Sequence, residues 1–143
     1  MTEIMAEQRM PEWFEARKGR ITGSVVGAIL GLNPYKKPDD VMRDMLADAA
    51  GEPREFQGND ATSWGTMNES GAIFDYEMQT GNSVKKCGFY TYEDWLGASP
   101  DGLVGDDGLI EVKCPYRLKN EESPEFKTAA EQLYYFAQIQ IQL

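Results

Sequence analysis

The amino-acid sequence predicts an α/β fold, and three observations support this fold class. Apolar runs at residues 103–104 and 109–114 flank a Gly-Asp-Asp-Gly cluster, which predicts a β-hairpin because Gly and Asp tolerate the positive φ angles of tight turns. Residues 61–80 and 126–143 carry apolar side chains at helical spacing. The hydrophobic content of 41%, with 11% aromatic residues, indicates a packed core. The length of 143 residues suits a single domain, residues 1–143.

Histidine is absent from the sequence, and cysteine occurs twice. The lack of histidine excludes Ser-His-Asp catalysis, Cys-His catalysis and histidine-ligated metals. Cys87 and Cys114 are too far apart for a CxxC pair, and two cysteines cannot complete a zinc or iron–sulfur set. We expect Cys114 to be a buried thiol in a reducing cytoplasm. Any catalysis must therefore use carboxylates, lysine, tyrosine or amides.

The chain is acidic, with a formal net charge of −10 at pH 7. This charge argues against a non-specific DNA-coating protein, which would be basic. It leaves room for a nuclease, because local basic clusters can line a channel and bound cations offset the carboxylates of a site. No apolar run approaches the roughly 18 residues that span a bilayer, and the N-terminus lacks the hydrophobic region of a signal peptide. We expect a cytoplasmic protein with no membrane partner.

The first third of the chain is predicted to be helical after a polar lead at residues 1–10, which we expect to fray. Pro11 is favourable in the first turn of a helix, and Gly31 is a C-terminal stop signal. Thr22 or Ser24 is a candidate N-cap for the second helix. Helices are expected at residues 11–17, 21–30 and 40–50, the last capped by Asp39 and followed by a polar loop at 51–59.

The rest of the chain alternates between strand and helix patterns. The longest helical pattern covers residues 61–80 and is closed by Gly81. Residue alternation predicts strands at 84–92 and 95–99, and the second strand runs into the Pro100–Asp101 corner. The hairpin, a loop at 116–119 and a helix at 126–143 complete the order of elements.

The predicted hairpin places three charged side chains together. Alternate residues of a strand share a face, so Glu111 and Lys113 point the same way while the apolar residues between them point toward the core. The turn brings Asp101 back beside Glu111. Two close carboxylates are costly unless a cation neutralises them, and carboxylate oxygens suit Mg²⁺ or Mn²⁺. With Lys113 to orient a water, these groups match metal-assisted phosphodiester hydrolysis; the alternative is a surface hairpin with solvated charges.

The two arms of this hairpin also carry sequence motifs. Residues 99–103, Ser-Pro-Asp-Gly-Leu, and residues 109–115, Leu-Ile-Glu-Val-Lys-Cys-Pro, resemble the catalytic core of the phage lambda exonuclease and YqaJ-type viral recombinase family. That family belongs to the PD-(D/E)XK nuclease superfamily. The resemblance runs from about Trp13 to the C-terminus. It implies a restriction-endonuclease-like α/β core, in which helices flank a mixed β-sheet, with additional N-terminal helices.

The segment before this core resembles a second family motif, W-x-x-x-R followed by G-x-[IV]-T-[AG]-S, which spans residues 13–24 here. The resemblance implies that Arg17 and Ser24 help to hold the 5′-terminal phosphate, and that Ser99 of the catalytic core contacts DNA. Arginine suits this task because its guanidinium can bind phosphate through two hydrogen bonds. The alternative is a capped pair of amphipathic helices with Trp13 in the core.

A third match lies in the long helix. Residues 64–69 resemble the family's W-G-x-x-x-E motif, which implies that Glu69 reaches the metal site directly or through water. In the loop at 116–119, Lys119 or Arg117 would fill the family's basic phosphate contact. The alternatives are an ordinary exposed helical glutamate and solvated loop charges.

The last predicted helix carries the fourth match. Residues 135–140 resemble the family's Y-x-x-Q-x-Q motif, and Tyr135 and Gln138 are neighbours on a helix surface because they lie three positions apart. The resemblance implies that Gln138 acts near the metal or the scissile strand and that Tyr135 contacts DNA. The alternative is a solvent-exposed helix face lined with glutamines.

Together these matches imply Mg²⁺-dependent hydrolysis of linear duplex DNA from a 5′ end, with Mn²⁺ as an alternative ion. Asp101 and Glu111 would bind the metal, with Glu69 and the backbone carbonyl of Val112 as further ligands, and Lys113 would activate the attacking water. The implied partners are double-stranded DNA ends, a single-strand annealing protein and further copies of the chain in a trimer. A phage-encoded chain would act in the host cytoplasm.

Two other functions stay open. An endonuclease or repair nuclease of the same superfamily would share Asp101, Glu111 and Lys113 and would also cut circular DNA. A non-catalytic module that binds DNA ends would fit an acidic chain, although such a module has no need of Lys113. Family members usually continue beyond the last predicted helix, so we expect either a C-terminally truncated piece or a compact variant, for which the implied ring assembly is in doubt.

Overall fold

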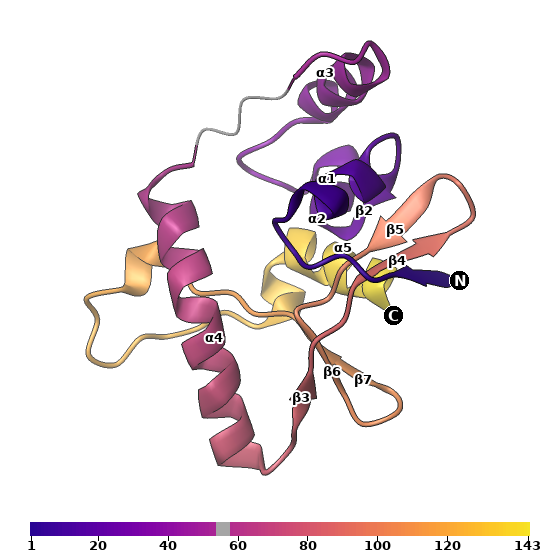
Figure 1. Ribbon diagram of the computed structural model, residues 1–143. Coiled ribbons are helices and arrows are strands. Elements are labelled where there is room, and N and C mark those ends of the chain that lie inside the picture. The colour runs from indigo at the N-terminus through magenta and orange to yellow at the C-terminus, as the bar shows by residue number, and fades with distance from the viewer. Residues whose placement is uncertain (54–57) are drawn as a thin grey trace. The chain divides into compact units, whose positions relative to one another are not determined.

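The computed structural model describes residues 1–53 and 58–143, and these form two compact units. The first unit contains the residues up to 53, residues 87–100 and residues 127–143, and the second contains residues 58–86 and 101–126 (Figure 1). Residues 54–57 of the predicted polar loop lie outside the described residues. One crossing between the units is the Pro100–Asp101 peptide bond. The expectation of one domain stays a prediction.

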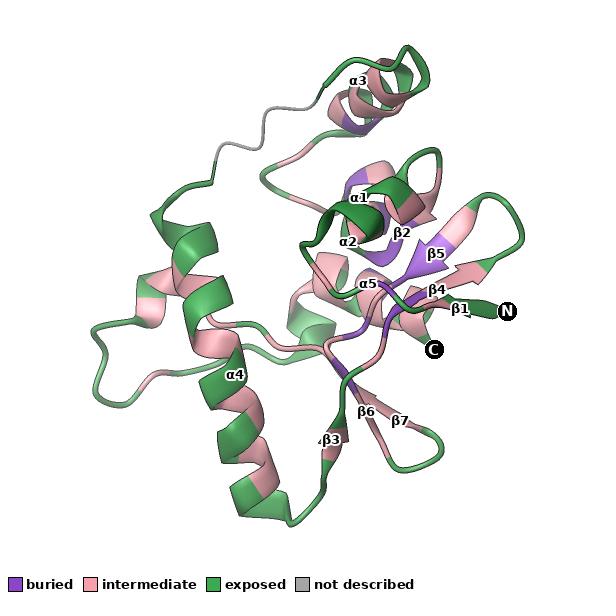
Figure 2. Ribbon diagram, in the orientation of Figure 1, coloured by how far each residue is buried: buried purple, intermediate pink, exposed green. Residues whose placement is uncertain are grey.

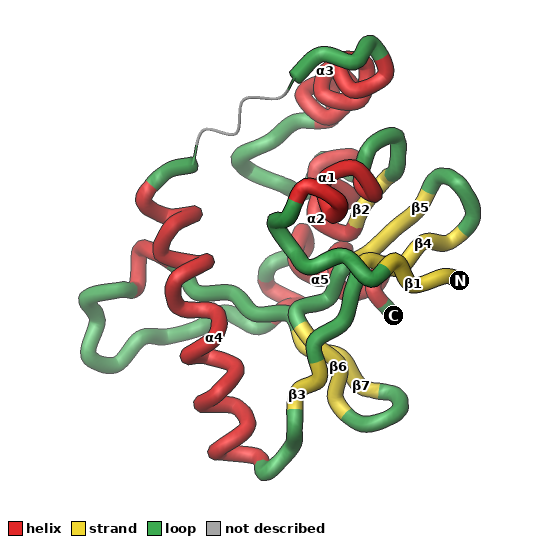
Figure 3. The backbone as a smooth tube through the Cα atoms, viewed as in Figure 1, coloured by secondary structure: helices red, strands yellow, loops and turns green. Residues whose placement is uncertain are grey.

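The first unit is built on a mixed four-stranded sheet, whose strands are yellow in Figure 3. Three strands pair antiparallel and the fourth, β2, runs parallel to its neighbour β5. In spatial order the strands are β1 (Thr2–Ile4), β4 (Phe89–Tyr92), β5 (Leu96–Ala98) and β2 (Ile21–Thr22).

The N-terminal lead belongs to this sheet, so the prediction that residues 1–10 fray was wrong. Ile4 lies opposite Phe89, whose side chain is fully buried at 0% exposure. The Glu3 carboxylate also accepts a hydrogen bond from the backbone N–H of Gly88 at 2.8 Å. These contacts join residues more than 80 positions apart, which local sequence patterns cannot report.

The first unit also contains four helices, and three of them differ from prediction in their boundaries. Ile21 and Thr22 form strand β2 and not the start of a helix, and Thr22 makes no side-chain cap bond. The third helix begins earlier than predicted, because the Asp40 side chain accepts a bond from the Lys37 N–H at 3.0 Å. The last helix begins later, after a separate 3₁₀ turn at Ala129–Glu131. The helices are α1 (Pro11–Arg17), α2 (Gly23–Ile29), α3 (Pro38–Ala49) and α5 (Leu133–Gln142).

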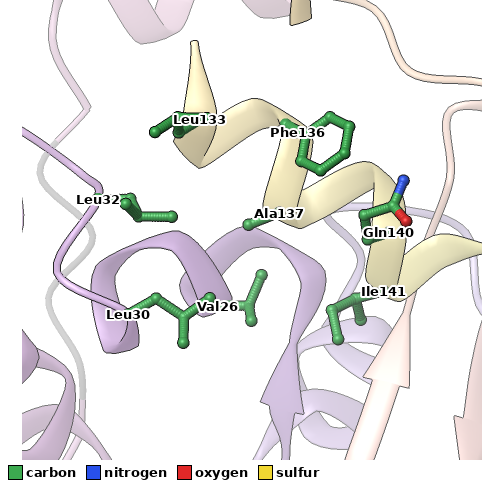
Figure 4. Close-up of a pocket in the computed structure, with 8 residues that line it drawn as sticks. All are labelled: Val26, Leu30, Leu32, Leu133, Phe136, Ala137, Gln140 and Ile141. Carbon is green, nitrogen blue, oxygen red and sulfur yellow. The ribbon is translucent and has the colours of Figure 1, made fainter. Parts of the chain in front are cut away.

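Helices α2 and α5 pack against each other through Gly27. A Cβ atom at this position would lie 2.8 Å from the Cβ of Tyr134 and 3.1 Å from its carbonyl oxygen. An apolar pocket of about 280 Å³ opens beside this contact, lined from α2 and the residues after it by Val26, Leu30 and Leu32 (Figure 4). The absence of a side chain at Gly27 is therefore what lets the two helices approach.

Replacing Gly27 with Ala is expected to lower the free energy of unfolding by about 1–3 kcal/mol, because the added methyl group meets the backbone of α5. Gly71 in α4 is the matched control, since a Cβ there meets nothing within 4 Å. Gly71→Ala should raise the free energy of unfolding by about 0.5–1 kcal/mol through helix propensity alone. Urea denaturation measures both variants, and equal effects would contradict the packing assigned to α2 and α5.

The second unit contains the predicted hairpin as a three-stranded antiparallel sheet in the order β3, β6, β7. Gly102 pairs with Ile110, and Gly105 in the turn has a φ of +63°, as the Gly-Asp-Asp-Gly cluster predicts. The strands are β3 (Val84–Lys85), β6 (Gly102–Val104) and β7 (Gly108–Ile110).

The strand predicted over residues 84–92 is divided between the two units, with β3 in one sheet and β4 in the other. Gly88 lies at this break, and a Cβ there would be 2.1 Å from the carbonyl oxygen of Ile4. Because β1 approaches the backbone so closely at Gly88, the alternating residues 84–92 form two separate strands and not one.

Helix α4 (Asp60–Thr80) lies in the second unit with the 3₁₀ turn η1 (Tyr116–Leu118). The Asn59 side chain accepts a bond from the Thr62 N–H at 2.9 Å, and Gly81 ends the helix at a φ of +72°. Its bounds agree with the prediction to within one residue. None of its 21 residues is buried (Figure 2). Within the described ranges, no helix is both long and apolar enough to cross a membrane.

Candidate active site

The hairpin holds Asp101 by its backbone and by its carboxylate. The Asp101 N–H donates to the carbonyl oxygen of Ile110 at 3.1 Å, and the Val112 N–H donates to Asp101 Oδ2 at 2.6 Å. Strand β7 therefore ends at Ile110, whereas the sequence predicted a strand through Cys114. The Asp101 carboxylate accepts the Val112 N–H, which a neighbouring strand would otherwise accept. Glu111 and Lys113 therefore lie just after the end of the strand.

Glu111 and Lys113 form an ion pair beside Asp101. The Lys113 Nζ lies 2.8 Å from Glu111 Oε1, and the Glu111 side chain is only 10% exposed. The Lys113 side chain is 34% exposed and reaches solvent. The pair thus places one ammonium group at the edge of a carboxylate that is nearly buried.

The pKa of Asp101 is raised to about 6. Burial of the carboxyl group is the largest cause, followed by the negative charge of Glu111 and, more weakly, that of Glu69. The Val112 N–H and the Lys113 ammonium act in the opposite direction. The second unit therefore brings together Asp101, Glu111, Lys113 and Glu69, all of which the sequence singled out.

Cys114 lies next to the same carboxylates. Burial raises the pKa of its thiol, and the charges of Glu69 and Asp101 raise it further. The residue has intermediate exposure, so the expectation of a fully buried thiol was wrong. The charge of Glu69 raises the pKa of both Cys114 and Asp101, so Glu69 of α4 lies near these two residues.

The donor chemistry of this cluster fits a hard divalent cation. Among residues 1–53 and 58–143, no three His, Cys, Asp or Glu side chains are arranged to hold a metal ion together. The Glu111 carboxylate faces Lys113 in this arrangement. Burial and, after it, the negative charge of Glu111 nevertheless raise the pKa of Asp101, and a cation bound by both carboxylates would offset their repulsion.

A second cluster of predicted residues forms around Arg17 in the first unit. Its Nη2 donates to Ser24 Oγ at 2.7 Å and to Thr22 Oγ1 at 3.4 Å. The guanidinium carbon lies 4.2 Å from the centre of the Trp13 ring, a cation–π contact. Arg17 and Ser24 are therefore neighbours, and a planar cation is held between an aromatic face and two hydroxyl groups.

Ser99 is the centre of a hydrogen-bond network in the same unit. Its hydroxyl oxygen accepts from Gln8 Nε2 and from Trp13 Nε1, both at 3.1 Å, and its hydroxyl donates to the Gly88 carbonyl at 3.4 Å. A hydroxyl group has one donor and two acceptor sites, so these three contacts occupy all the hydrogen-bonding sites of the Ser99 hydroxyl. Trp13, expected in the core, thus has a polar contact as well as a packing role.

The remaining predicted residues are divided between the units. Tyr135 and Gln138 lie on α5 in the first unit, and Gln138 Cγ would be 3.5 Å from a Cβ at Gly23. Lys119 lies in the second unit, where its Nζ donates to the Tyr116 hydroxyl at 2.6 Å and sits 3.9 Å from the centre of that ring. The DNA-binding roles of Tyr135 and Lys119, and the role of Gln138 near the metal or the scissile strand, stay predictions.

Sequence reasoning missed Gln8. The residue was part of a lead expected to fray, yet its side-chain amide reaches Ser99 and Pro100. No local pattern identifies it, because its partners lie 91 and 92 positions further along the chain.

A family model described as the YqaJ-like viral recombinase domain matches residues 12–143. Among curated proteins, the chain is 25% identical over 150 residues to an uncharacterized protein, R354, of Acanthamoeba polyphaga mimivirus. It is 27% identical over 135 residues to the uncharacterized protein YqaJ of Bacillus subtilis. These alignments cover 96% and 86% of the chain but 27% and 41% of the two relatives.

Solved structures of an alkaline exonuclease, LHK-Exo, resemble this chain. The enzyme from Laribacter hongkongensis is 31% identical with a TM-score of 0.73, over 93% of this chain and 66% of that chain. The structure of LHK-Exo in complex with dAMP has the same identity and TM-score over 92% and 66%. The chain thus spans about two thirds of the exonuclease and less than half of either curated relative.

Proposed function

The chain belongs to the YqaJ-like viral recombinase domain family, and from that premise we propose that it is a metal-dependent deoxyribonuclease that degrades linear duplex DNA from a 5′ end. Its structural likeness to the alkaline exonuclease confirms the predicted fold, a PD-(D/E)XK-type mixed sheet flanked by helices. The observation that carries the proposal is the grouping of Asp101, Glu111 and Lys113 at the end of one hairpin.

Asp101 and Glu111 would hold Mg²⁺, or Mn²⁺ in its place, with Glu69 and the Val112 carbonyl as further ligands. A divalent ion in such a site lowers the pKa of a bound water and offsets negative charge on the phosphate. The Val112 N–H keeps one oxygen of Asp101 in a fixed direction. Burial of Asp101 strengthens its interaction with a cation, since fewer waters compete for the carboxylate.

Lys113 would orient the attacking water and offset the charge that develops on the phosphate. Its ion pair with Glu111 fixes the ammonium beside the reacting centre. A lysine also cannot accept a hydrogen bond while protonated, so it directs its N–H groups toward oxygen atoms of the water or the phosphate. This division of roles leaves metal binding to the carboxylates and positioning to the lysine.

The cluster around Arg17 would receive the 5′-terminal phosphate. The guanidinium is oriented by Trp13 and Ser24, which reduces the entropy lost when it binds an anion. Lys119 would add a further contact to the DNA backbone. Ser99 would contact a phosphate oxygen by redirecting its O–H from the Gly88 carbonyl, which lies 3.4 Å away. Tyr135 and Gln138 would support the strand that is cut.

The proposed partners follow from this reaction. Double-stranded DNA ends are the substrate, and the single strand that remains suits a single-strand annealing protein. Further copies of the chain in a trimer would keep the enzyme on one duplex between cuts. We place the reaction in the cytoplasm, which for a viral gene is that of the host.

Digestion of linear and covalently closed circular duplex DNA tests the proposal. With Mg²⁺ only the linear DNA should disappear, EDTA should stop the reaction, and Asp101→Ala should be inactive. Loss of the circle as well would favour an endonuclease of the same superfamily. A folded protein that retains DNA ends without cutting either substrate would overturn the enzymatic proposal in favour of a binding module.

Replacing Arg17 with Met is expected to raise the KM for 5′-phosphorylated ends by about 10- to 100-fold, the range for losing a hydrogen bond to a charged group. The KM for 5′-hydroxyl ends should change little, because the missing contact is to the terminal phosphate. Arg43→Met is the matched control, since the Arg43 side chain on α3 is 76% exposed. Equal changes in KM for both kinds of end would contradict a phosphate role for Arg17.

A further inference from the structure

The Pro100–Asp101 peptide group is held on both of its polar atoms. The Pro100 carbonyl accepts a hydrogen bond from Gln8 Nε2 at 3.1 Å, and Cys87 Sγ approaches the same oxygen at 3.5 Å. On the other side, the Asp101 N–H donates to the Ile110 carbonyl. A peptide group is planar, so the direction of its carbonyl determines the direction of its N–H.

Gln8 is well suited to hold this corner. A side-chain amide has two N–H donors, and the two shorter contacts of Gln8 go to Ser99 Oγ and to the Pro100 carbonyl. Pro100 is buried and lies between the ends of β5 and β6, outside both strand ladders. A buried carbonyl needs a hydrogen-bond donor, and Gln8 supplies one to this oxygen from 92 positions earlier in the chain.

The backbone around Gln8 forms a tight turn. Met10 N–H donates to the Glu7 carbonyl at 3.2 Å, which closes a four-residue turn around Gln8. Arg9, inside this turn, has a φ of +67°. A residue other than glycine rarely adopts this backbone conformation, so contacts around Arg9 must compensate for its energetic cost. The bonds from Gln8 to Ser99 and Pro100 join this turn to the end of β5.

We infer that Gln8 is a positioning residue, which sets the orientation of the Pro100–Asp101 peptide group and through it the carboxylate of Asp101. This inference rests on the proposed function of Asp101 as a metal ligand. Gln8 lies before residues 12–143, the part that the family model matches. Its role would be to keep the Asp101 carboxylate in the direction that binds the ion, without touching the ion or the DNA.

The test compares Gln8→Met, which keeps the length but removes both donors, with Gln79→Met on the exposed face of α4. The measured quantity is the Mn²⁺ concentration that gives half-maximal cleavage of linear DNA. Permanently inactive protein lowers the amount of cleavage and leaves this midpoint unchanged, and urea denaturation checks that each variant is fully folded at the assay temperature. We expect it to rise at least fivefold for Gln8→Met, with the KM for DNA unchanged, and to stay unchanged for Gln79→Met. Gln8→Asn, which keeps the amide but shortens its reach, replaces Gln8→Met if that variant does not fold.

Calorimetric titration with Mn²⁺ gives a second readout that needs no turnover. Gln8→Met should weaken Mn²⁺ binding in the wild-type background and should have no further effect when Asp101 is already replaced by Asn. Equal weakening in both backgrounds would overturn the inference, as would an unchanged midpoint in an active Gln8→Met enzyme. A folded wild-type protein with neither cleavage nor Mn²⁺ binding would instead overturn the proposed function, and the inference with it.

Discussion

Asp101→Asn is expected to abolish DNA cleavage and, in the metal-free protein, to raise the free energy of unfolding at pH 8. The amide removes a negative charge that is buried beside Glu111 and Glu69. Its Oδ1 can still accept the Val112 N–H, so the hairpin keeps the bond seen at 2.6 Å. The variant therefore separates the charge of Asp101, which the proposed chemistry needs, from its role in the fold.

The gain in stability should depend on pH in a defined direction. The pKa of Asp101 is about 6 in the folded protein, against 3.8 for an ordinary aspartate, the value expected in the unfolded chain. Between these two pH values the folded state retains the proton and the unfolded state has lost it. The contribution of Asp101 to the stability of the wild type therefore falls as pH rises from about 4 to about 6, and its full cost is present above that range. For a fully buried group this difference in pKa would lower the free energy of unfolding by about 3 kcal/mol. Partial solvent screening of Asp101 reduces the effect to about 1–2 kcal/mol.

Urea unfolding in EDTA at pH 4 and pH 8 measures this effect. Asp101→Asn and the wild type should be equally stable at pH 4, and the variant should be the more stable at pH 8. Saturating Mg²⁺ should reduce the difference, because it stabilises the wild-type carboxylate alone. Asp107→Asn in the exposed hairpin turn is the matched control and should show no pH-dependent gain. A constant difference at both pH values would contradict the assigned electrostatic cause.

Lys113→Met is expected to lower the rate of cleavage by about 10²- to 10⁴-fold, the range for losing a positioned catalytic group. The variant keeps the aliphatic bulk of the side chain and removes the ammonium that lies 2.8 Å from Glu111. Lys113 also lowers the pKa of Asp101, so its loss should raise that pKa further. The pH at which half of the residual activity is lost on the acid side should therefore move upward.

Single-turnover cleavage at saturating Mg²⁺ measures the rate, and the same assay across pH at a subsaturating Mg²⁺ concentration measures the midpoint on the acid side. Lys86→Met is the matched control, because Lys86 is an exposed lysine of the same unit. This control should retain its single-turnover rate even if its affinity for DNA falls. A Lys113→Met rate within twofold of the wild type would mean that the ammonium takes no part in the chemistry.

The sequence alone was sufficient for the parts of the fold that local chemistry controls. The Gly-Asp-Asp-Gly cluster predicted the turn between β6 and β7, where Gly105 indeed has a positive φ. Asn59 and Gly81 delimit α4 through a side-chain cap and a left-handed glycine, signals that act within one helical turn. The grouping of Asp101 with Glu111 followed from the same turn, since a hairpin brings together residues a few positions on either side of it.

Only the tertiary structure decided the features that depend on contacts between distant residues. The N-terminal strand pairs with β4 and, with Gly88, divides one predicted strand between two sheets. Gln8 reaches Ser99 and Pro100 across more than 90 positions. The physical reason is that turns and caps are selected by a residue's own backbone preferences, whereas buried polar groups are satisfied by whichever donor the assembled core brings near. The residues of the proposed catalytic cluster could thus be named from the sequence, whereas the contacts that hold the Pro100–Asp101 corner appear only in the fold.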